Sequence, residues 1–264
     1  MRILQLGRFW NDQHGGIERH VAMLSQGLAG AGADVTNLVA SLDDTGSDEV
    51  LDGYRLIRAP SLGIVASTAM SPALVWRALQ LYRQKPFDIV HLHLPDPLSH
   101  LVSLLLPRKI KRVITWHSDI VKQKKLLEMY QPWLGRLVHK ADAIVAATQA
   151  HFSSSTQIPK DVDARKLRVI AYGIDDGAFE VNRCFEPRMR EIRQLAGGKL
   201  LVYALGRHVY YKGFDVLIRA MRTVDGVLIL GGDGLLRESL QAQAEQLGVA
   251  GKVLFQGRIP EDQL

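Results

Sequence analysis

Residues 2–40 read RILQLGRFWNDQHGGIERHVAMLSQGLAGAGADVTNLVA. The apolar run Arg2–Leu6 predicts a β-strand, and Val35–Ala40 predicts a second one. Between them, apolar residues recur at helical spacing, at Ile17, Val21, Leu24 and Leu28. This spacing predicts a helix over Ile17–Ala29 that lays one face on a sheet. A strand, a glycine turn, a helix and a further strand in this order indicate a parallel βαβ arrangement.

The same alternation continues for about the first two thirds of the chain. Further strands are predicted at Ile89–Leu94, Val113–Trp116, Ala143–Ala147 and Val169–Ala171. Further helices are predicted at Pro72–Gln84 and Lys125–Lys140. Alternating strands and helices predict an α/β fold in which helices cover both faces of a parallel sheet.

The pattern pauses over Asp175–Gly198, which holds Pro187 and a Gly197-Gly198 pair, and then begins again. The second series predicts strands at Leu200–Leu205, Val227–Leu230 and Val253–Gln256, and helices at Phe214–Met221 and Leu235–Leu247. We therefore expect an N-terminal domain over 1–176, a linker over 177–197 and a second domain over 198–264. Three strands are fewer than a doubly wound domain usually has, so we expect the second domain to be partial.

The composition indicates an ordinary globular protein. The chain has 264 residues, of which 47% are hydrophobic and 23% charged, and its single cysteine, Cys184, excludes an internal disulfide framework. The apolar run at the N-terminus is too short for a signal peptide, and no apolar segment approaches the ~20 residues that span a bilayer. We expect a cytoplasmic protein.

The net charge is +6, and the excess is concentrated in one region. Arg108 to Lys140 holds nine lysines and arginines against two acidic residues, Asp119 and Glu128. This excess indicates either attraction to an anionic membrane or substrate, or simply a solvated basic face. No RRM, zinc-finger or helix-turn-helix signature accompanies it, so we do not expect nucleic acid as a partner.

Gly15 and Gly16 follow the first predicted strand and immediately precede a helix. Free backbone amides at a helix N-terminus suit an anion such as a diphosphate, and glycine lets the backbone approach closely. A plain turn is the alternative. The stretch is not G-x-G-x-x-G, so the dinucleotide fingerprint is absent. His14 and Asn11 in the same loop face either a ligand or solvent.

The stretch GRHVYYKG at residues 206–213 is the most informative for chemistry. It follows a predicted strand and precedes a helix, at the sheet edge where ligands bind in parallel sheets. Arg207 offers a planar fork for phosphate and Lys212 a compact charge. Together they suit a leaving diphosphate whose negative charge grows as its bond breaks. Structural ion pairs are the alternative, and the P-loop pattern is absent.

Two further strand ends carry polar or glycine residues. Gly232 and Gly234 permit a tight turn near a ligand, and Asp233 between them either caps the following helix or lies near that ligand. His117 ends a strand, where its imidazole either hydrogen-bonds a ligand hydroxyl or caps a loop.

Four histidines raise the question of a metal: His91, His93, His100 and His117. His91 and His93 alternate on one strand face, but no adjacent carboxylate or cysteine completes a ligand set. We therefore expect buried or strand-end polar contacts and no metal.

Taken in order, these stretches resemble the large family of retaining GT-B glycosyltransferases, of the family 4 type, that includes bacterial mannosyl- and rhamnosyltransferases for surface polysaccharides. The resemblance spans nearly the whole chain. It is carried by GGIE at 15–18, DIVHLH at 88–93, TWHSD at 115–119, YGID at 172–175, Gly206-Arg207 with Lys212-Gly213, and GDG at 232–234.

The resemblance implies a GT-B architecture, with a complete N-terminal Rossmann-like domain for the acceptor, a partial C-terminal Rossmann-like domain for the nucleotide sugar, and the active site between them. It implies a hexose donor linked to a nucleoside diphosphate, transfer with retention, and no metal or other cofactor. The acceptor it implies is a glycan or a lipid-linked oligosaccharide at the cytoplasmic membrane face, in polysaccharide biosynthesis.

Site roles follow from matching positions. Arg207 and Lys212 would hold the donor diphosphate, and the Gly15-Gly16 loop would approach its phosphates and sugar. His117 would contact the donor sugar and help to stabilise the transition state. Asp233, with Gly232 and Gly234, would lie near the donor pocket. The insertion 209–211 resembles the mannosyl- and rhamnosyltransferase subgroup, which favours a GDP-linked donor such as GDP-mannose.

One departure concerns the region after residue 264. The family continues there with a Glu-x7-Glu region that holds the donor sugar and ribose, so we expect the 264-residue chain to be a fragment with little or no turnover of its own. The alternatives are a non-catalytic fragment or another sugar-nucleotide enzyme on the same fold, such as an epimerase or a phosphorylase.

Overall fold

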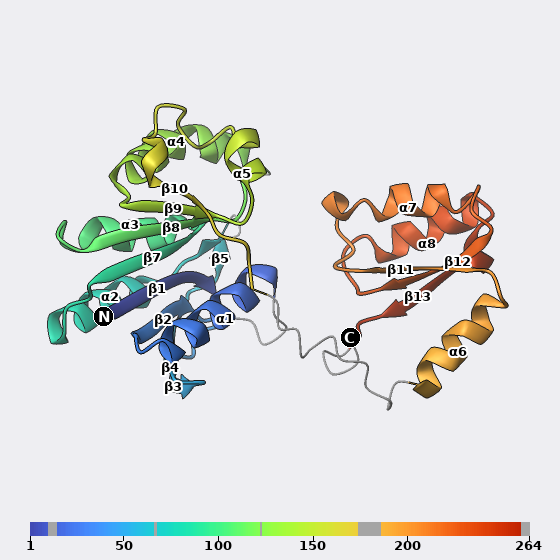
Figure 1. Ribbon diagram of the computed structural model, residues 1–264, viewed down its shortest axis with the longest axis horizontal. Helices are drawn as coiled ribbons and strands as arrows, with labels where there is room; N and C mark the ends of the chain where they lie inside the picture. The colour runs from blue at the N-terminus through green and yellow to red at the C-terminus, as the bar shows by residue number, and fades with distance from the viewer. Residues whose placement is uncertain (10–14, 66–67, 122, 174–185, 260–264) are drawn as a thin grey trace. The chain divides into compact units, whose positions relative to one another are not determined.

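The computed structural model forms two compact units, unit 1 over Met1–Ile174 and unit 2 over Asp175–Leu264 (Figure 1). It describes residues 1–9, 15–65, 68–121, 123–173 and 186–259. Asn11 and His14, named above as loop residues, therefore lie outside the described residues. Each unit has its own sheet and its own hydrophobic core.

Unit 1 is built on an eight-stranded sheet with the order β10-β9-β8-β7-β1-β2-β4-β3, and Figure 1 shows the strands stacked in this order. All neighbours pair in parallel except β3 and β4, which are antiparallel. The strands are β1 (Arg2–Phe9), β2 (Asp34–Ala40), β3 (Ser47–Leu51), β4 (Tyr54–Ala59), β7 (Ile89–Leu94), β8 (Lys111–Trp116), β9 (Ala143–Ala146) and β10 (Leu167–Val169). Strands β5 (Ile64–Val65) and β6 (Thr68–Ala69) form a separate two-stranded sheet, and β6 contacts β1.

Helices cover both faces of the unit 1 sheet, as the sequence predicts. They are α1 (Gly16–Gly30), α2 (Pro72–Gln84), α3 (Pro97–Leu105), α4 (Lys124–Lys140) and α5 (Gln149–Ser154), with a 3-10 turn η1 (Ala164–Lys166). Strand β2 shows the division: Val35 and Val39 join Val21 of α1 in one cluster, whereas Leu38 and Ala40 join the larger cluster that includes α2, α3 and α4. Successive side chains of a strand point to opposite faces, so each alternate set meets a different helical layer.

Helices α2 and α3 begin with the local signals that favour helix starts. The Ser71 hydroxyl accepts a hydrogen bond from the Leu74 amide at 3.1 Å, and the Asp96 carboxylate accepts one from the Leu98 amide at 3.2 Å. In both helices proline follows the capping residue, where its missing N–H costs nothing. Helix α1 differs, because its N-cap, Gly15, has no side chain with which to cap the first amides.

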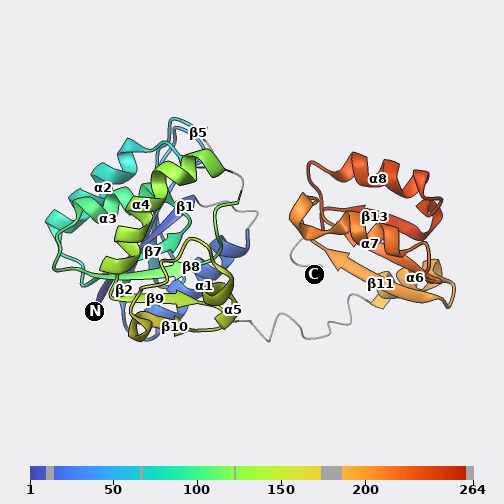
Figure 2. The ribbon, with the colours of Figure 1, turned by 90° about the horizontal axis from the view of Figure 1, so that it is seen from above.

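Unit 2 contains a three-stranded parallel sheet in the order β11-β12-β13. Its elements are α6 (Glu186–Ala196), β11 (Leu200–Leu205), η4 (Tyr210–Lys212), α7 (Phe214–Ala220), β12 (Gly226–Gly231), α8 (Arg237–Gln246), η5 (Ala250–Lys252) and β13 (Val253–Gly257). Helices α7 and α8 pack side by side, as Figure 2 shows. They cover one face of the sheet, and α6 lies on the opposite face (Figure 1).

The structure confirms the predicted parallel sheets and most of the predicted strands, with several differences. Strands β3, β4, β5 and β6 were not predicted, and β10 begins at Leu167, two residues earlier than expected. Residues 186–196, expected within a linker, form helix α6 and pack on β11 and β12. None of the helices in the described part of the chain has both the length and the apolar character needed to cross a bilayer.

Candidate functional site

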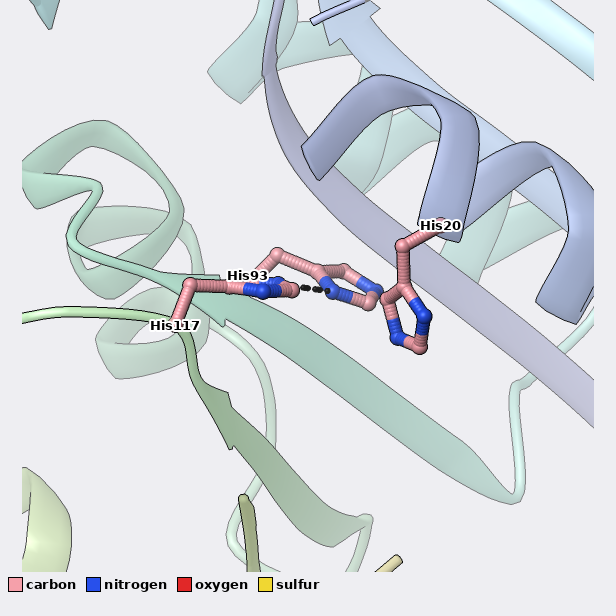
Figure 3. Close-up of side chains that lie close together, drawn as sticks. All are labelled: His20, His93 and His117. Atoms are coloured by element: carbon pink, nitrogen blue, oxygen red, sulfur yellow. Dashed lines mark hydrogen bonds between the residues drawn. The ribbon is translucent and has the colours of Figure 1, made fainter. Parts of the chain in front are cut away.

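Four aromatic side chains gather at the carboxyl ends of the unit 1 strands. His93 lies on β7, and His117 directly follows the end of β8. His20 projects from α1, and Tyr172 follows β10 (Figure 3 shows the three histidines). The ring centroid of His20 is 5.3 Å from that of His117 and 4.2 Å from that of Tyr172. Segments distant in sequence thus meet where parallel sheets bind ligands.

Hydrogen bonds join these rings into one series. His93 Nδ1 lies 3.1 Å from His117 Nε2, the contact drawn as a dashed line in Figure 3. His93 Nε2 lies 2.7 Å from Gln5 Oε1, and His117 Nδ1 lies 2.7 Å from the Tyr172 hydroxyl. Neighbouring His91 stacks on His93 with centroids 4.5 Å apart, but its own Nε2 bonds Thr115 Oγ1 at 2.7 Å. The predicted buried polar contacts of His91 and His93 are confirmed.

Burial keeps these imidazoles neutral. Loss of hydration, with a smaller contribution from His20, lowers the pKa of His117 to about 3 and that of His91 to about 3. The same desolvation lowers the pKa of His93 well below its usual range and lowers the pKa of His20. At neutral pH, each ring therefore offers one N–H donor and one acceptor nitrogen.

Among the described residues, His20, His93 and His117 also form a group that could hold a metal ion, because one nitrogen from each lies within 4.8 Å of the others. Neutral imidazoles are suitable ligands. However, the facing nitrogens of His93 and His117 are already bonded to each other. His100, a candidate from sequence, lies on α3 and instead bonds the Tyr130 hydroxyl at 2.9 Å.

Gly15 and Gly16 open α1, one turn before His20. A Cβ on Gly16 would meet no atom within 4 Å, so the backbone there is open to an incoming group. At Gly15 a Cβ would lie 2.2 Å from Glu18 Oε2, which places the Glu18 carboxylate over the first turn of α1. The helix N-terminus thus attracts an anionic group from its own chain, as expected for uncapped amides.

In unit 2, the loops that follow β11 and β12 are joined by backbone hydrogen bonds. The His208 amide donates to the Asp233 carbonyl at 2.8 Å, and the Leu236 amide donates to the His208 carbonyl at 3.1 Å. At Gly232, which has φ of +103°, a Cβ would lie 2.0 Å from the Gly206 carbonyl oxygen. Only glycine permits this approach. The loops that hold Arg207 and Gly232–Gly234 therefore form one rigid surface.

That surface carries two cationic side chains, Arg207 and Lys212, which both lie close to Tyr211. Arg207 Nη2 donates to the Tyr211 hydroxyl at 3.2 Å, and Lys212 Nζ lies 5.9 Å from the centre of the Tyr211 ring. Both cationic side chains are exposed, and within the described residues neither has a carboxylate within salt-bridge distance. The alternative of structural ion pairs is thus not supported, and the pair is open to an anion.

Asp233 is not the cap of the following helix, and this alternative from sequence is wrong. Helix α8 begins at Arg237 with Leu236 as its N-cap, because a turn intervenes after Gly234. The Asp233 carboxylate instead accepts a hydrogen bond from the Gly234 amide at 2.8 Å and lies 3.9 Å from Arg237 Nη1.

The structure thus groups the predicted residues in two sets, one in each unit. Gly15, Gly16 and His117 belong to unit 1, and the remaining predicted residues to unit 2. Sequence reasoning missed His20, Gln5 and the contact of Tyr172. For His20 a signal was available, because it lies one helical turn after Gly16 and so faces the same strand ends.

Comparison with known proteins gives two family matches. The family described as Glycosyltransferase Family 4 matches residues 14–177, and the family described as Glycosyl transferases group 1 matches residues 185–264. The two matches cover every residue assigned to a site above except Gln5.

Individual relatives agree with these matches. The chain is 29% identical to O-antigen chain mannosyltransferase C of Escherichia coli over 99% of this chain and 68% of the relative. It is 31% identical to D-rhamnosyltransferase WbpZ of Pseudomonas aeruginosa over 99% of this chain and 67% of the relative. Among solved structures, sucrose-phosphate synthase from Thermosynechococcus elongatus matches with a TM-score of 0.77 at 18% identity, over 99% of this chain and 71% of that one. The architecture is GT-B, as expected.

Proposed function

Because this chain belongs to glycosyltransferase family 4, we propose that it moves a hexose from a nucleoside-diphosphate sugar to a glycan or lipid-linked acceptor, with retention at the anomeric carbon. The two relatives with mannosyl- and rhamnosyltransferase names support a hexose of the mannose or rhamnose type. The O-antigen chain in the first name supports a role in surface polysaccharide biosynthesis. We propose a GDP-linked donor because the insertion 209–211 resembles that of the mannosyl- and rhamnosyltransferase subgroup.

The observation that carries the proposal is the exposed cation pair of unit 2. Arg207 and Lys212 lie on a glycine-rigidified surface, share Tyr211 and have no carboxylate partner in the described residues. A diphosphate gains negative charge as the sugar leaves it, so two fixed cations stabilise the transition state more than the ground state. The same two charges do the work of a divalent ion, and we propose a reaction without metal or other cofactor.

We further propose that His117 contacts the donor sugar. Its neutral ring suits a hydrogen bond to a hydroxyl, because the ring can accept or donate without a net charge. Gly15 and Gly16 would contribute open backbone beside the phosphates, where Glu18 now lies. Gly232, Asp233 and Gly234 would form the floor of the surface that carries the cations.

The test is donor turnover in the full-length protein, with Arg207→Gln and Lys212→Gln set against Arg219→Gln as a matched control. Arg219 is an exposed cation of the same unit whose guanidinium pairs with Asp215 at 2.9 Å. We expect each of the first two changes to lower kcat/KM by about a hundredfold, because each removes a charge-assisted contact. Equal activity in Arg207→Gln and Arg219→Gln would contradict the proposal. The anomeric configuration of the product, read by proton NMR, tests retention.

The donor preference needs a separate measurement. A depletion screen with GDP-mannose, GDP-linked 6-deoxyhexoses and UDP-hexoses should show consumption of a GDP-linked sugar. Preference for a UDP-hexose would refute the GDP assignment but not the diphosphate site, because Arg207 and Lys212 are proposed to bind the diphosphate that both kinds of donor share.

We also propose that helix α4 holds unit 1 at an anionic membrane surface on the cytoplasmic side. Leu126, Met129 and Trp133 follow one another at helical spacing and are 54%, 76% and 54% exposed. Lys125 and Arg136 flank them, and the Arg136 guanidinium lies 5.2 Å from the Trp133 ring centre. An apolar stripe beside cations suits an interfacial helix. Nucleic acid is not a proposed partner.

Vesicle sedimentation tests the membrane proposal. Trp133→Ser should reduce binding to vesicles that contain anionic lipid, whereas Trp76→Ser is the matched control, because Trp76 is a 60% exposed tryptophan on α2 of the same unit. Binding that is indifferent to anionic lipid, or equally reduced by both changes, would contradict a specific role for α4.

A further inference from the structure

Both ring nitrogens of His117 are already occupied. Nε2 faces His93 Nδ1 at 3.1 Å, and Nδ1 faces the Tyr172 hydroxyl at 2.7 Å. Beyond His93 the series ends at Gln5, whose Oε1 lies 2.7 Å from His93 Nε2. We call Gln5, His93, His117 and Tyr172 the Gln5–Tyr172 relay. A donor hydroxyl can therefore reach His117 only by replacing one of these bonds.

The relay admits only two arrangements of its protons when both imidazoles are neutral, because every bond needs one donor and one acceptor. In the first, the Tyr172 hydroxyl donates to His117 Nδ1, His117 Nε2–H donates to His93 Nδ1, and His93 Nε2–H donates to Gln5 Oε1. In the second, the Gln5 amide is turned, and each bond runs in the opposite direction. Both arrangements give His93 and His117 the same tautomer, Nε2–H in the first and Nδ1–H in the second.

The two ends of the relay differ in depth. Gln5 is 0% exposed and His93 is 2% exposed, whereas Tyr172 and His117 are half-buried. A buried bond is costly to leave unmade, so the inner end of the relay is fixed. The bond to Tyr172 is the one that a ligand hydroxyl can replace, because that end of the relay is partly exposed.

We propose that Gln5 and His93 are positioning residues that set the tautomer of His117, and that the Tyr172 hydroxyl holds the place of the donor-sugar hydroxyl at His117 Nδ1. The inference rests on the proposed function in one respect, the contact of His117 with the donor. It adds that the inner residues decide whether His117 accepts a hydrogen bond from that hydroxyl or donates one to it.

Histidine tautomers are tested directly by long-range proton–nitrogen NMR of the full-length protein labelled with 15N-histidine, without donor. We expect His93 and His117 to show the same tautomer. Gln5→Leu should change the ring-nitrogen signals of both residues. Thr115→Val is the matched control, because it removes the buried bond to His91, which stacks on His93 but lies outside the relay. It should leave His117 unchanged.

Three results would overturn the relay. One is opposite tautomers at His93 and His117. Another is a His117 signal that responds to Thr115→Val as strongly as to Gln5→Leu. The third is a joint change in the ring-nitrogen signals of His20, His93 and His117 on addition of equimolar Zn²⁺, with each ring keeping one N–H, which would identify these three residues as a metal site.

Kinetics test the connection to the donor. Gln5→Leu should lower kcat about tenfold, the value of one lost hydrogen bond, and Thr115→Val should leave kcat nearly unchanged. Tyr172→Phe should lower the donor KM, because the competing hydroxyl is removed. A raised KM in Tyr172→Phe would overturn the displacement of Tyr172. If the tautomers of His93 and His117 are coupled but Gln5→Leu leaves kcat unchanged, the relay is confirmed and the proposed contact of His117 with the donor is refuted.

Discussion

Acidification is expected to destabilise unit 1 through its buried histidines. Burial lowers the pKa of His91 to about 3 in the folded chain, from 6.5 for an ordinary histidine. As the pH falls below about 6.5, His91 becomes protonated in the unfolded chain but stays neutral in the folded chain, so the free energy of unfolding decreases. The contribution of neutral, buried His91 to stability is fully present above the unfolded-state pKa of 6.5, and it is lost progressively as the pH falls from there to about 3.

The size of the effect follows from the two pKa values. Between about pH 7 and about pH 5, His91 alone removes about 2 kcal/mol from the free energy of unfolding. His117, with a pKa of about 3, and His100, with a pKa of about 4, contribute losses of similar size. Asp96 acts in the opposite sense, because burial raises the pKa of its carboxyl. The total loss is a large part of the stability of a typical domain.

The assay is urea unfolding followed by tryptophan fluorescence at about pH 7 and about pH 5. All four tryptophans, at positions 10, 76, 116 and 133, lie in unit 1, so the signal reports this unit alone. The double variant His91→Phe/Thr115→Val should lose about 2 kcal/mol less than its control Thr115→Val, which keeps His91. Both carry Asp96, so its contribution cancels. Equal losses in the two variants, or a wild-type unit 1 that is as stable at about pH 5 as at about pH 7, would show that the buried His91 does not destabilise unit 1 in acid.

Three further outcomes are expected. Gly232→Ala should destabilise unit 2 by about 2 kcal/mol or more in thermal unfolding followed by circular dichroism, because the added Cβ would lie 2.0 Å from the Gly206 carbonyl oxygen. Gly251→Ala is the control and should change stability little, because open space surrounds Gly251. Similar melting temperatures of the two variants would contradict the expected clash at Gly232. His208→Leu should stabilise unit 2 by about 1 kcal/mol, because the buried ring has no hydrogen-bond partner among the described residues, and a loss of stability would reveal a partner. A chelator should leave transfer by the full-length protein unchanged, and activity restored by Mg²⁺ or Mn²⁺ would contradict the proposed absence of a metal.

Sequence periodicity was sufficient for the elements whose faces are strongly apolar. The central residues of strands β1, β2, β7 and β8 are buried and mostly apolar, which is characteristic of parallel sheets, although each strand also holds polar residues. Strand β3 was not predicted because Ser47–Leu51 is an edge strand with two acidic residues and therefore lacks an apolar run. Helix α6 was not predicted because Glu186–Ala196 holds many charged residues and also Pro187, and a glycine pair follows it, which together indicated a linker.

The candidate site also contains residues that sequence could predict and residues that it could not. Arg207 and Lys212 could be found from sequence, because both belong to one short loop whose position at a strand end is a local property. The relay could not be found, because Gln5, His93, His117 and Tyr172 come from four separate segments. Their contacts depend on strand order, and no spacing in the sequence specifies that β7 lies between β1 and β8.

Calorimetric titration of the full-length protein with GDP and with GMP tests whether Arg207 and Lys212 hold the donor diphosphate. We expect GDP to bind at least about tenfold more tightly than GMP, because its second phosphate gains charge-assisted contacts, and we expect the difference to disappear in Arg207→Gln/Lys212→Gln. Equal affinity for the two nucleotides in the wild-type protein, or a GDP preference that survives the double change, would show that these two side chains do not hold the diphosphate.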